Sequence, residues 1–135
     1  MGRHGVAKTI RFCYGHRIEG HGGPCAHAHG HNARVEIECR GPIDGLGMVV
    51  DFSSIKERVE AWILANWDHR MILRRTDPLA AALRALGEPV YELEGAPTAE
   101  NLAAILFRVA KEAGLPVTAV RFWETDASVA LFEGA

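Results

Sequence analysis

Histidine is concentrated in one short stretch of this sequence. Five of the seven histidines fall between residues 16 and 31, and the segment 25–31 reads Cys-Ala-His-Ala-His-Gly-His. Neutral imidazole nitrogens bind zinc well, and a site with three protein ligands leaves a fourth position open for water or substrate. An open position is typical of catalytic rather than structural zinc. The residue types therefore suggest a catalytic metal site, provided that three imidazoles can meet.

Two segments of alternating hydrophobicity would position these imidazoles. In residues 10–16, the apolar side chains share a face with His16, and in residues 29–39, His29 and His31 extend an apolar face. Such alternation predicts half-buried strands. If the two strands pair, His16, His29 and His31 converge at one end of a sheet, and we predict that they are the zinc ligands.

The same residues allow other interpretations. A histidine on an apolar face is often a satisfied core residue, and a histidine-rich loop can bind metal adventitiously. Cys25 could also be the fourth ligand of a closed structural zinc site, because thiolate binds zinc well. His27 lies two positions before His29, so its side chain could lie on the same face as His29 and His31. The spacing alone therefore leaves the ligand set and the purpose of the metal open.

Four residues outside this stretch are further candidates for chemistry. Asp68 and His69 are adjacent, and a carboxylate beside an imidazole can support acid–base catalysis, although such pairs are also common on ordinary surfaces. Glu124 lies on the apolar face of a predicted strand, where a carboxylate needs a partner. Thr98 follows a proline at a predicted helix start and is explained first as an N-cap.

The remaining pattern predicts an α+β fold. Three helices are expected in the middle of the chain, over residues 54–63, 79–86 and 98–113. The first should begin at a capping box of Ser54 and Glu57. Two more strands are expected at 117–124 and 128–132. Strands that are neighbours in sequence, with helices between the two pairs, indicate a four-stranded antiparallel sheet with helices on one face.

Composition limits the possible function classes. The 135 residues suit a single domain, 1–135, and 48% hydrophobic residues argue against disorder. A formal net charge of −2 gives no reason to expect nucleic acid or an anionic membrane as a partner. We expect no secretion signal and no membrane span, because no apolar run is long enough. Three cysteines fit a reducing cytoplasm, and we expect Cys13 and Cys39 to be small core side chains.

Five elements, in order, resemble one enzyme family. They are Cys25 followed after three intervening residues by His29-Gly30-His31-Asn32, Val50-Asp51-Phe52 with Lys56, Asp68-His69, Pro97-Thr98-Ala99-Glu100-Asn101, and Glu124-Thr125. Together they resemble the 6-pyruvoyltetrahydropterin synthases and their bacterial relatives, the 6-carboxytetrahydropterin synthases of queuosine biosynthesis. The resemblance covers nearly the whole chain, from about Phe12 to Phe132.

The resemblance implies a fold and an assembly. Family members have a tunnelling fold, in which each subunit contributes a four-stranded antiparallel sheet with helices packed outside. Three subunits close their sheets into a barrel, and two barrels stack into a homohexamer. The face that carries Arg34, Glu36, Glu38 and Arg40 would then line a wet tunnel. The exposed sheet edges would also be covered.

The resemblance also implies a role for each candidate residue. Family members act on 7,8-dihydroneopterin triphosphate, and zinc on the three histidines binds the side-chain oxygens and acidifies the adjacent C–H. Cys25 would be the thiolate base, with Asp68 and His69 relaying protons. Glu124 would bind the N–H and amino donors of the pterin and join the relay. Thr98 would contribute to substrate binding from a neighbouring subunit.

The gap between Cys25 and His29 bears on the reaction. Three intervening residues resemble the bacterial type, which forms 6-carboxy-5,6,7,8-tetrahydropterin, acetaldehyde and triphosphate. A 6-pyruvoyltetrahydropterin synthase or another pterin side-chain lyase is the alternative enzyme. A non-catalytic zinc- or pterin-binding relative is the alternative of another class. The joint presence of Cys25, Asp68, His69 and Glu124 favours an enzyme.

Overall fold

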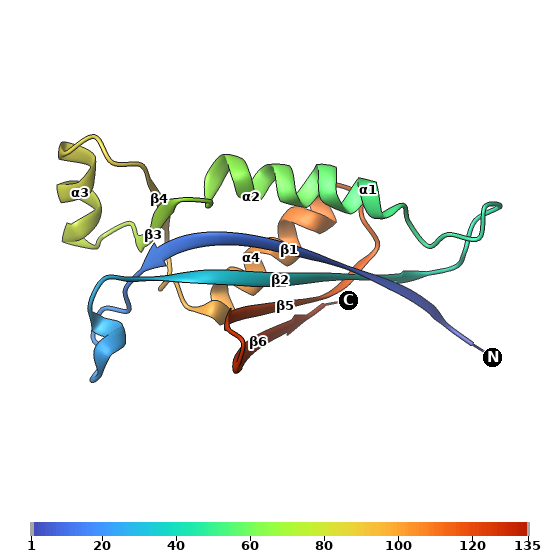
Figure 1. The fold of residues 1–135 in the computed structure, drawn as a ribbon, viewed down its shortest axis with the longest axis horizontal. Coiled ribbons are helices and arrows are strands. Elements are labelled where there is room, and N and C mark those ends of the chain that lie inside the picture. Colours follow the sequence, from blue (N-terminus) through green and yellow to red (C-terminus); the bar gives the residue numbers. More distant parts are fainter. Residues whose placement is uncertain (1, 135) are drawn as a thin grey trace.

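A computed structural model describes residues 2–134 of the chain, which form a twisted sheet with helices packed against it (Figure 1). The strands are β1 (His4–His16), β2 (His29–Gly41), β3 (Arg70–Arg74), β4 (Val90–Leu93), β5 (Val117–Thr125) and β6 (Ser128–Glu133). The helical segments are η1 (Pro24–Ala26), α1 (Phe52–Ile55), η2 (Lys56–Glu60), α2 (Ala61–Asn66), α3 (Pro78–Ala85) and α4 (Ala99–Glu112). The strand order in the sheet is β4-β3-β1-β2-β5-β6.

The two longest strands, β1 and β2, form the pair that the alternating pattern predicted. They are antiparallel, and their register sets His16 opposite His29 and Tyr14 opposite His31. Side chains of one parity are buried in both strands, and the other parity is partly exposed. The predicted apolar faces are therefore confirmed, and the histidines stand at the end of the buried face.

The helices that pack on this face explain why it is buried. The segments α1, η2 and α2 form one helical run along the sheet, and α3 lies beyond the β4 edge (Figure 1). Side chains of that run and of α4 join the strand residues in one core: Ile55, Val59, Ile63, Leu102 and Leu106. Each side chain of this kind contributes about 1.5–3 kcal/mol when it leaves water.

The prediction of four antiparallel strands is wrong in number and in direction. β3 adds to β1 in parallel, and β4 adds to β3 in parallel, so the sheet is mixed and has six strands. Both added strands are short, and β3 has two adjacent buried residues, Ile72 and Leu73. A strand buried on both faces lacks the period-two pattern that identified the other four.

The first helix begins earlier than the predicted capping box. Asp51 is the N-cap, and its carboxylate accepts from the backbone N–H of Ser53 at 2.9 Å. Ser54 lies inside the helix, because a carboxylate three residues upstream caps it first. The second helix, α3, begins at Pro78, one residue earlier than predicted, with Asp77 as its N-cap, and α4 begins after Thr98 as predicted. No helix among the described residues is long and apolar enough to span a membrane.

Candidate metal centre

The three predicted ligands meet at the end of the β1–β2 pair. One potential ligand atom from each of His16, His29 and His31 lies within 4.8 Å of the other two. Nε2 of His16 and Nε2 of His31 lie 3.2 Å apart. His16 is 2% exposed, whereas the other two are partly open. The cluster thus has a buried side and an accessible side.

Backbone carbonyls fix the orientation of two of these rings. Nδ1 of His16 lies 2.7 Å from the carbonyl oxygen of Pro97, and Nδ1 of His29 lies 2.7 Å from that of His27. A carbonyl oxygen can only accept, so each Nδ1 carries the proton and donates it. Each neutral ring then presents the lone pair of Nε2 toward the cluster. Such carbonyl contacts commonly orient histidines that bind metals, so the donor set fits a zinc ion.

Two other sequence candidates lie outside this cluster. His27 contributes its backbone carbonyl, and its exposed side chain belongs to neither of the two potential metal-binding groups found in residues 2–134. Cys25 lies in η1, half-buried, and it too belongs to neither group. The backbone carbonyl of Cys25 accepts from Ile18 N–H at 2.7 Å, which closes the loop between β1 and β2.

Glu124 and Tyr14 complete the buried side of the cluster. Oε2 of Glu124 lies 3.2 Å from Nε2 of His16 and 3.3 Å from Nε2 of His31. The hydroxyl of Tyr14 donates to the same oxygen at 3.3 Å. Hydrogen bonding to His16 holds the pKa of Glu124 below its usual range. Burial, followed by the charge of Glu124, raises the pKa of Tyr14, so its hydroxyl stays protonated.

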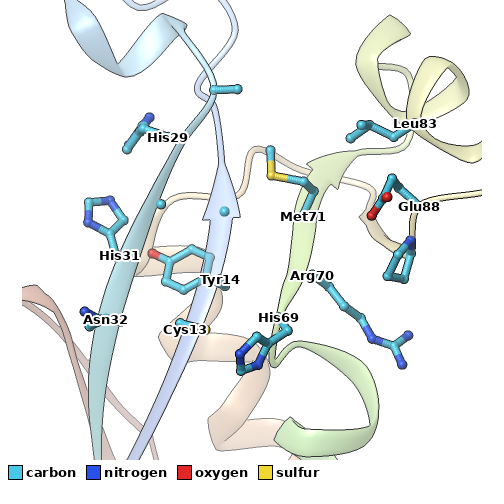
Figure 2. A pocket seen from close by; sticks show the side chains of 14 residues that line it. Cys13, Tyr14, His29, His31, Asn32, His69, Arg70, Met71, Leu83 and Glu88 are labelled. Carbon is cyan, nitrogen blue, oxygen red and sulfur yellow. The ribbon is translucent and has the colours of Figure 1, made fainter. Parts of the chain in front are cut away.

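The accessible side of the cluster opens into a cavity of about 660 Å³. Figure 2 shows its wall built from β1, β2 and β3, with Leu83 of α3 and Glu88 on the far side. His29 and His31 line the cavity together with His69. Met71 packs so closely over Gly15 that a side chain at position 15 would meet its sulfur. The cavity is large enough for a small organic ligand beside the histidines.

A second group of potential ligands lies at the start of β3. Asp68 bonds Nδ1 of His69 through Oδ2 at 2.8 Å, and its Oδ1 accepts from the backbone N–H of Cys13 at 3.2 Å. The thiol of Cys13 lies 3.9 Å from that oxygen. The prediction of Cys13 as a core side chain is wrong, because it faces away from the core, whereas Cys39 is fully buried as predicted. The side chain of His69 is 79% exposed.

Cys25 is not joined to this second group within one chain. Among the described residues, no hydrogen bond connects its thiol with Asp68 or His69, and the cavity lining includes His69 but not Cys25. Thr98 caps α4 by accepting from Asn101 N–H at 3.2 Å. Its neighbour Pro97 supplies the carbonyl that holds His16, so the start of α4 supports the metal cluster.

Sequence reasoning missed three contributors to the site. Tyr14 was assigned only to a strand face, although its parity with His16 placed it beside the histidines. Met71 and the α3–β4 connection were missed because they reach the cavity through the parallel strands that the pattern did not predict.

Comparisons with known proteins agree with this architecture. The family model described as 6-pyruvoyl tetrahydropterin synthase matches residues 5–135. A probable 6-carboxy-5,6,7,8-tetrahydropterin synthase of Halobacterium salinarum is 37% identical over 84% of this chain and 73% of its own. The 6-carboxy-5,6,7,8-tetrahydropterin synthase of Haemophilus influenzae is 31% identical over 91% of this chain and 94% of its own.

Solved structures share the fold. An uncharacterized protein of Wolinella succinogenes superposes with a TM-score of 0.85 at 24% identity, covering 100% of both chains. The 6-pyruvoyl tetrahydropterin synthase of Caenorhabditis elegans gives a TM-score of 0.73 at 22% identity, covering 100% of this chain and 98% of its own. With the family match over nearly its whole length, this chain belongs to the 6-pyruvoyl tetrahydropterin synthase family.

Proposed function

We propose that the protein is a zinc-dependent lyase that converts 7,8-dihydroneopterin triphosphate to 6-carboxy-5,6,7,8-tetrahydropterin, acetaldehyde and triphosphate. The observation that carries the proposal is the convergence of three imidazoles, two of them held through Nδ1 by carbonyls, beside a cavity of about 660 Å³. Several relatives that are 31–41% identical are named 6-carboxy-5,6,7,8-tetrahydropterin synthase, which supports the choice of reaction.

In this proposal His16, His29 and His31 hold the zinc. When bound, zinc supplies a Lewis acid that acidifies the C–H next to a coordinated side-chain oxygen. Buried His16 anchors the site, and His29 and His31 face the cavity from which the substrate side chain enters. The rings of His16 and His29, held by backbone carbonyls, keep their Nε2 atoms aimed at the cluster before substrate arrives.

Cys25 is the proposed base that removes the acidified proton as a thiolate. Asp68 orients the imidazole of His69 through a 2.8 Å bond, and this pair relays the proton. Since the pair does not contact Cys25 within one chain and His69 is 79% exposed, we infer that the relay is completed across a subunit interface. This inference fits the proposed homohexamer of two trimers.

Glu124 is the proposed acceptor for the N–H and amino donors of the pterin. Its depressed pKa keeps the carboxylate ionised at neutral pH, the form that accepts hydrogen bonds. It also lines a second cavity of about 390 Å³ that opens between α4 and β6. Thr98, at the start of α4, is the proposed contribution from a neighbouring subunit.

The product of the reaction tests the proposal. Purified zinc-loaded protein is incubated with 7,8-dihydroneopterin triphosphate, and the products are identified by mass spectrometry. We expect 6-carboxy-5,6,7,8-tetrahydropterin with acetaldehyde. A pyruvoyl product would instead identify a 6-pyruvoyltetrahydropterin synthase. Tight binding of unchanged substrate would identify a non-catalytic pterin-binding relative and would refute the lyase.

A further inference from the structure

The carboxylate of Glu124 and two metal-binding nitrogens form a compact triangle. Oε2 of Glu124 lies 3.2 Å from Nε2 of His16 and 3.3 Å from Nε2 of His31, and the two nitrogens are 3.2 Å apart. Ligand atoms bound tetrahedrally to zinc at about 2.0–2.1 Å lie about 3.3–3.4 Å from one another. The triangle therefore has the dimensions of one face of a tetrahedral zinc site.

The protonation of the His16 ring also indicates that this triangle can bind a metal ion. Nδ1 of His16 donates to the carbonyl of Pro97, so the neutral ring of His16 has a lone pair at Nε2. This lone pair faces Oε2 of Glu124, which also carries lone pairs. Two acceptors at 3.2 Å repel each other unless a cation lies between them, either a second proton on the His16 ring, which then hydrogen-bonds the carboxylate, or a metal ion. A metal ion bound by the histidines supplies that cation.

Tyr14 holds the carboxylate in this position. Its hydroxyl donates to Oε2, the same oxygen that faces the histidines, at 3.3 Å. Its ring is fixed between His16 and Phe122, with centroid distances of 5.1 and 5.7 Å. Tyr14 is 3% exposed, so its hydroxyl is shielded from bulk water. The oxygen is thus placed by a buried group that does not itself bind metal.

We propose that Glu124 supplies the fourth ligand to the metal held by His16, His29 and His31 in the substrate-free protein, with Tyr14 as the positioning residue. The inference rests on the proposed metal centre but not on the pterin reaction. Glu124 also lines the second cavity, together with Ala99 and Glu100. A ligand that enters this cavity with N–H donors would draw the carboxylate off the metal and open a coordination position. Substrate recognition and opening of the metal site would then be one event.

Metal binding by variants tests this inference without measuring turnover. Zinc affinity is measured by competition with a chelator, and the coordination number is read from the visible absorption of the cobalt(II)-loaded protein. Glu124→Ala should weaken zinc binding by at least about tenfold and change the cobalt spectrum. Added acetate should restore the spectrum by replacing the carboxylate. Tyr14→Phe should weaken zinc binding by up to about tenfold and retain the four-coordinate spectrum.

Glu100→Ala is the matched control, because Glu100 lines the same cavity but has no contact with the histidines among the described residues. Its affinity and spectrum should equal those of the wild type. Unchanged affinity and an unchanged cobalt spectrum in folded Glu124→Ala would overturn the inference while leaving the histidine site intact. Wild-type protein that binds neither metal would refute the metal centre itself, and this inference with it.

Discussion

His16 and Pro97 are joined by a hydrogen bond of 2.7 Å, in which Nδ1 of the imidazole donates to the backbone carbonyl. The two residues are 81 positions apart in sequence. The bond ties the end of β1 to the turn before α4, whose N-cap is Thr98. Folding of α4 onto the sheet therefore sets the orientation of the His16 ring, so the core and the histidine cluster form together.

Removal of any one of the three clustered imidazoles should abolish metal binding. His16→Ala, His29→Ala and His31→Ala each remove a ligand from a set whose atoms lie within 4.8 Å. Each purified variant should lose most of its zinc in elemental analysis. His27→Ala is the control, because it removes an exposed ring and keeps the carbonyl that holds His29. Loss of zinc from His27→Ala alone would refute this ligand set.

Cys25→Ala should separate the catalytic role of the thiol from a structural one. Cys25 lies outside the metal cluster, so the variant should retain zinc and bind substrate. Turnover should fall by about 10²–10⁴-fold, the usual contribution of a positioned base. Zinc content and turnover are measured on the same preparation.

Cys13→Ala is the comparison for this thiol. It removes a half-buried sulfur near Asp68 but leaves the backbone N–H that bonds this carboxylate at 3.2 Å. We expect less than about tenfold loss of turnover, because the Asp68–His69 pair stays in place. Full activity in Cys25→Ala would reject this residue as the base. Loss of zinc in Cys25→Ala would indicate that it is a ligand.

The sequence was sufficient to predict four of the six strands and the face on which the three clustered histidines lie. Strands β1, β2 and β5 each have one buried face and one partly exposed face, so alternating hydrophobicity identified them as strands. The same alternation placed His16, His29 and His31 on the buried side of the sheet. Alternation also identified the buried face of β2, and it placed Glu124 on the same face of β5 as Phe122.

The alternation pattern could not predict contacts between segments that are distant in sequence. β3 and β4 are short and largely enclosed, so neither shows a period-two pattern, and the cavity wall they form was missed. The contact between His16 and the Pro97 carbonyl could not be predicted from residue type, because every residue has a backbone carbonyl. Cys13 was misjudged against its own alternation, because it lies between Phe12 and Tyr14 and so occupies the opposite, partly exposed face of β1. Pattern shows which face a residue occupies but not which distant segment meets it.

The stability of the protein should depend on Asp77 in a pH-dependent way. Its buried carboxylate caps α3 by accepting from Leu79 N–H at 2.8 Å and bonds the guanidinium of Arg17 through both oxygens. The bond to Arg17 holds the pKa of Asp77 below its usual range. A carboxylate with a depressed folded-state pKa stabilises the fold above its unfolded pKa of about 3.9, and this contribution is lost as pH falls through the folded value.

Asp77→Asn should therefore unfold more easily in urea at pH 7, by about 1–3 kcal/mol. The difference from wild type should begin to narrow below about pH 4, where the carboxylate of the unfolded chain takes up a proton, and should shrink further as pH falls through the lower folded-state pKa. Glu94→Gln is the control, because Glu94 pairs with Arg75 at an exposed site where solvent screens the charges. An Asp77→Asn deficit that is equal at pH 7 and pH 3 would show that the charge does not contribute.

The edge of the sheet at β6 should be a subunit contact. β6 is the last strand in the order, so within residues 2–134 its outer backbone groups have no partner strand, and it exposes Val129 and Leu131 by 52% and 50%. An apolar open edge favours pairing with another chain. We predict a homohexamer of two trimers in sedimentation velocity, and a smaller species for the Val129→Lys/Leu131→Lys double variant, because like charges repel at the contact.

Leu86→Lys is the control for this prediction. Leu86 is 77% exposed and lies just after α3, so the variant should leave the assembly unchanged. Wild-type protein that sediments as a monomer at micromolar concentration would refute the assembly and the relay between Cys25 and the Asp68–His69 pair of another subunit.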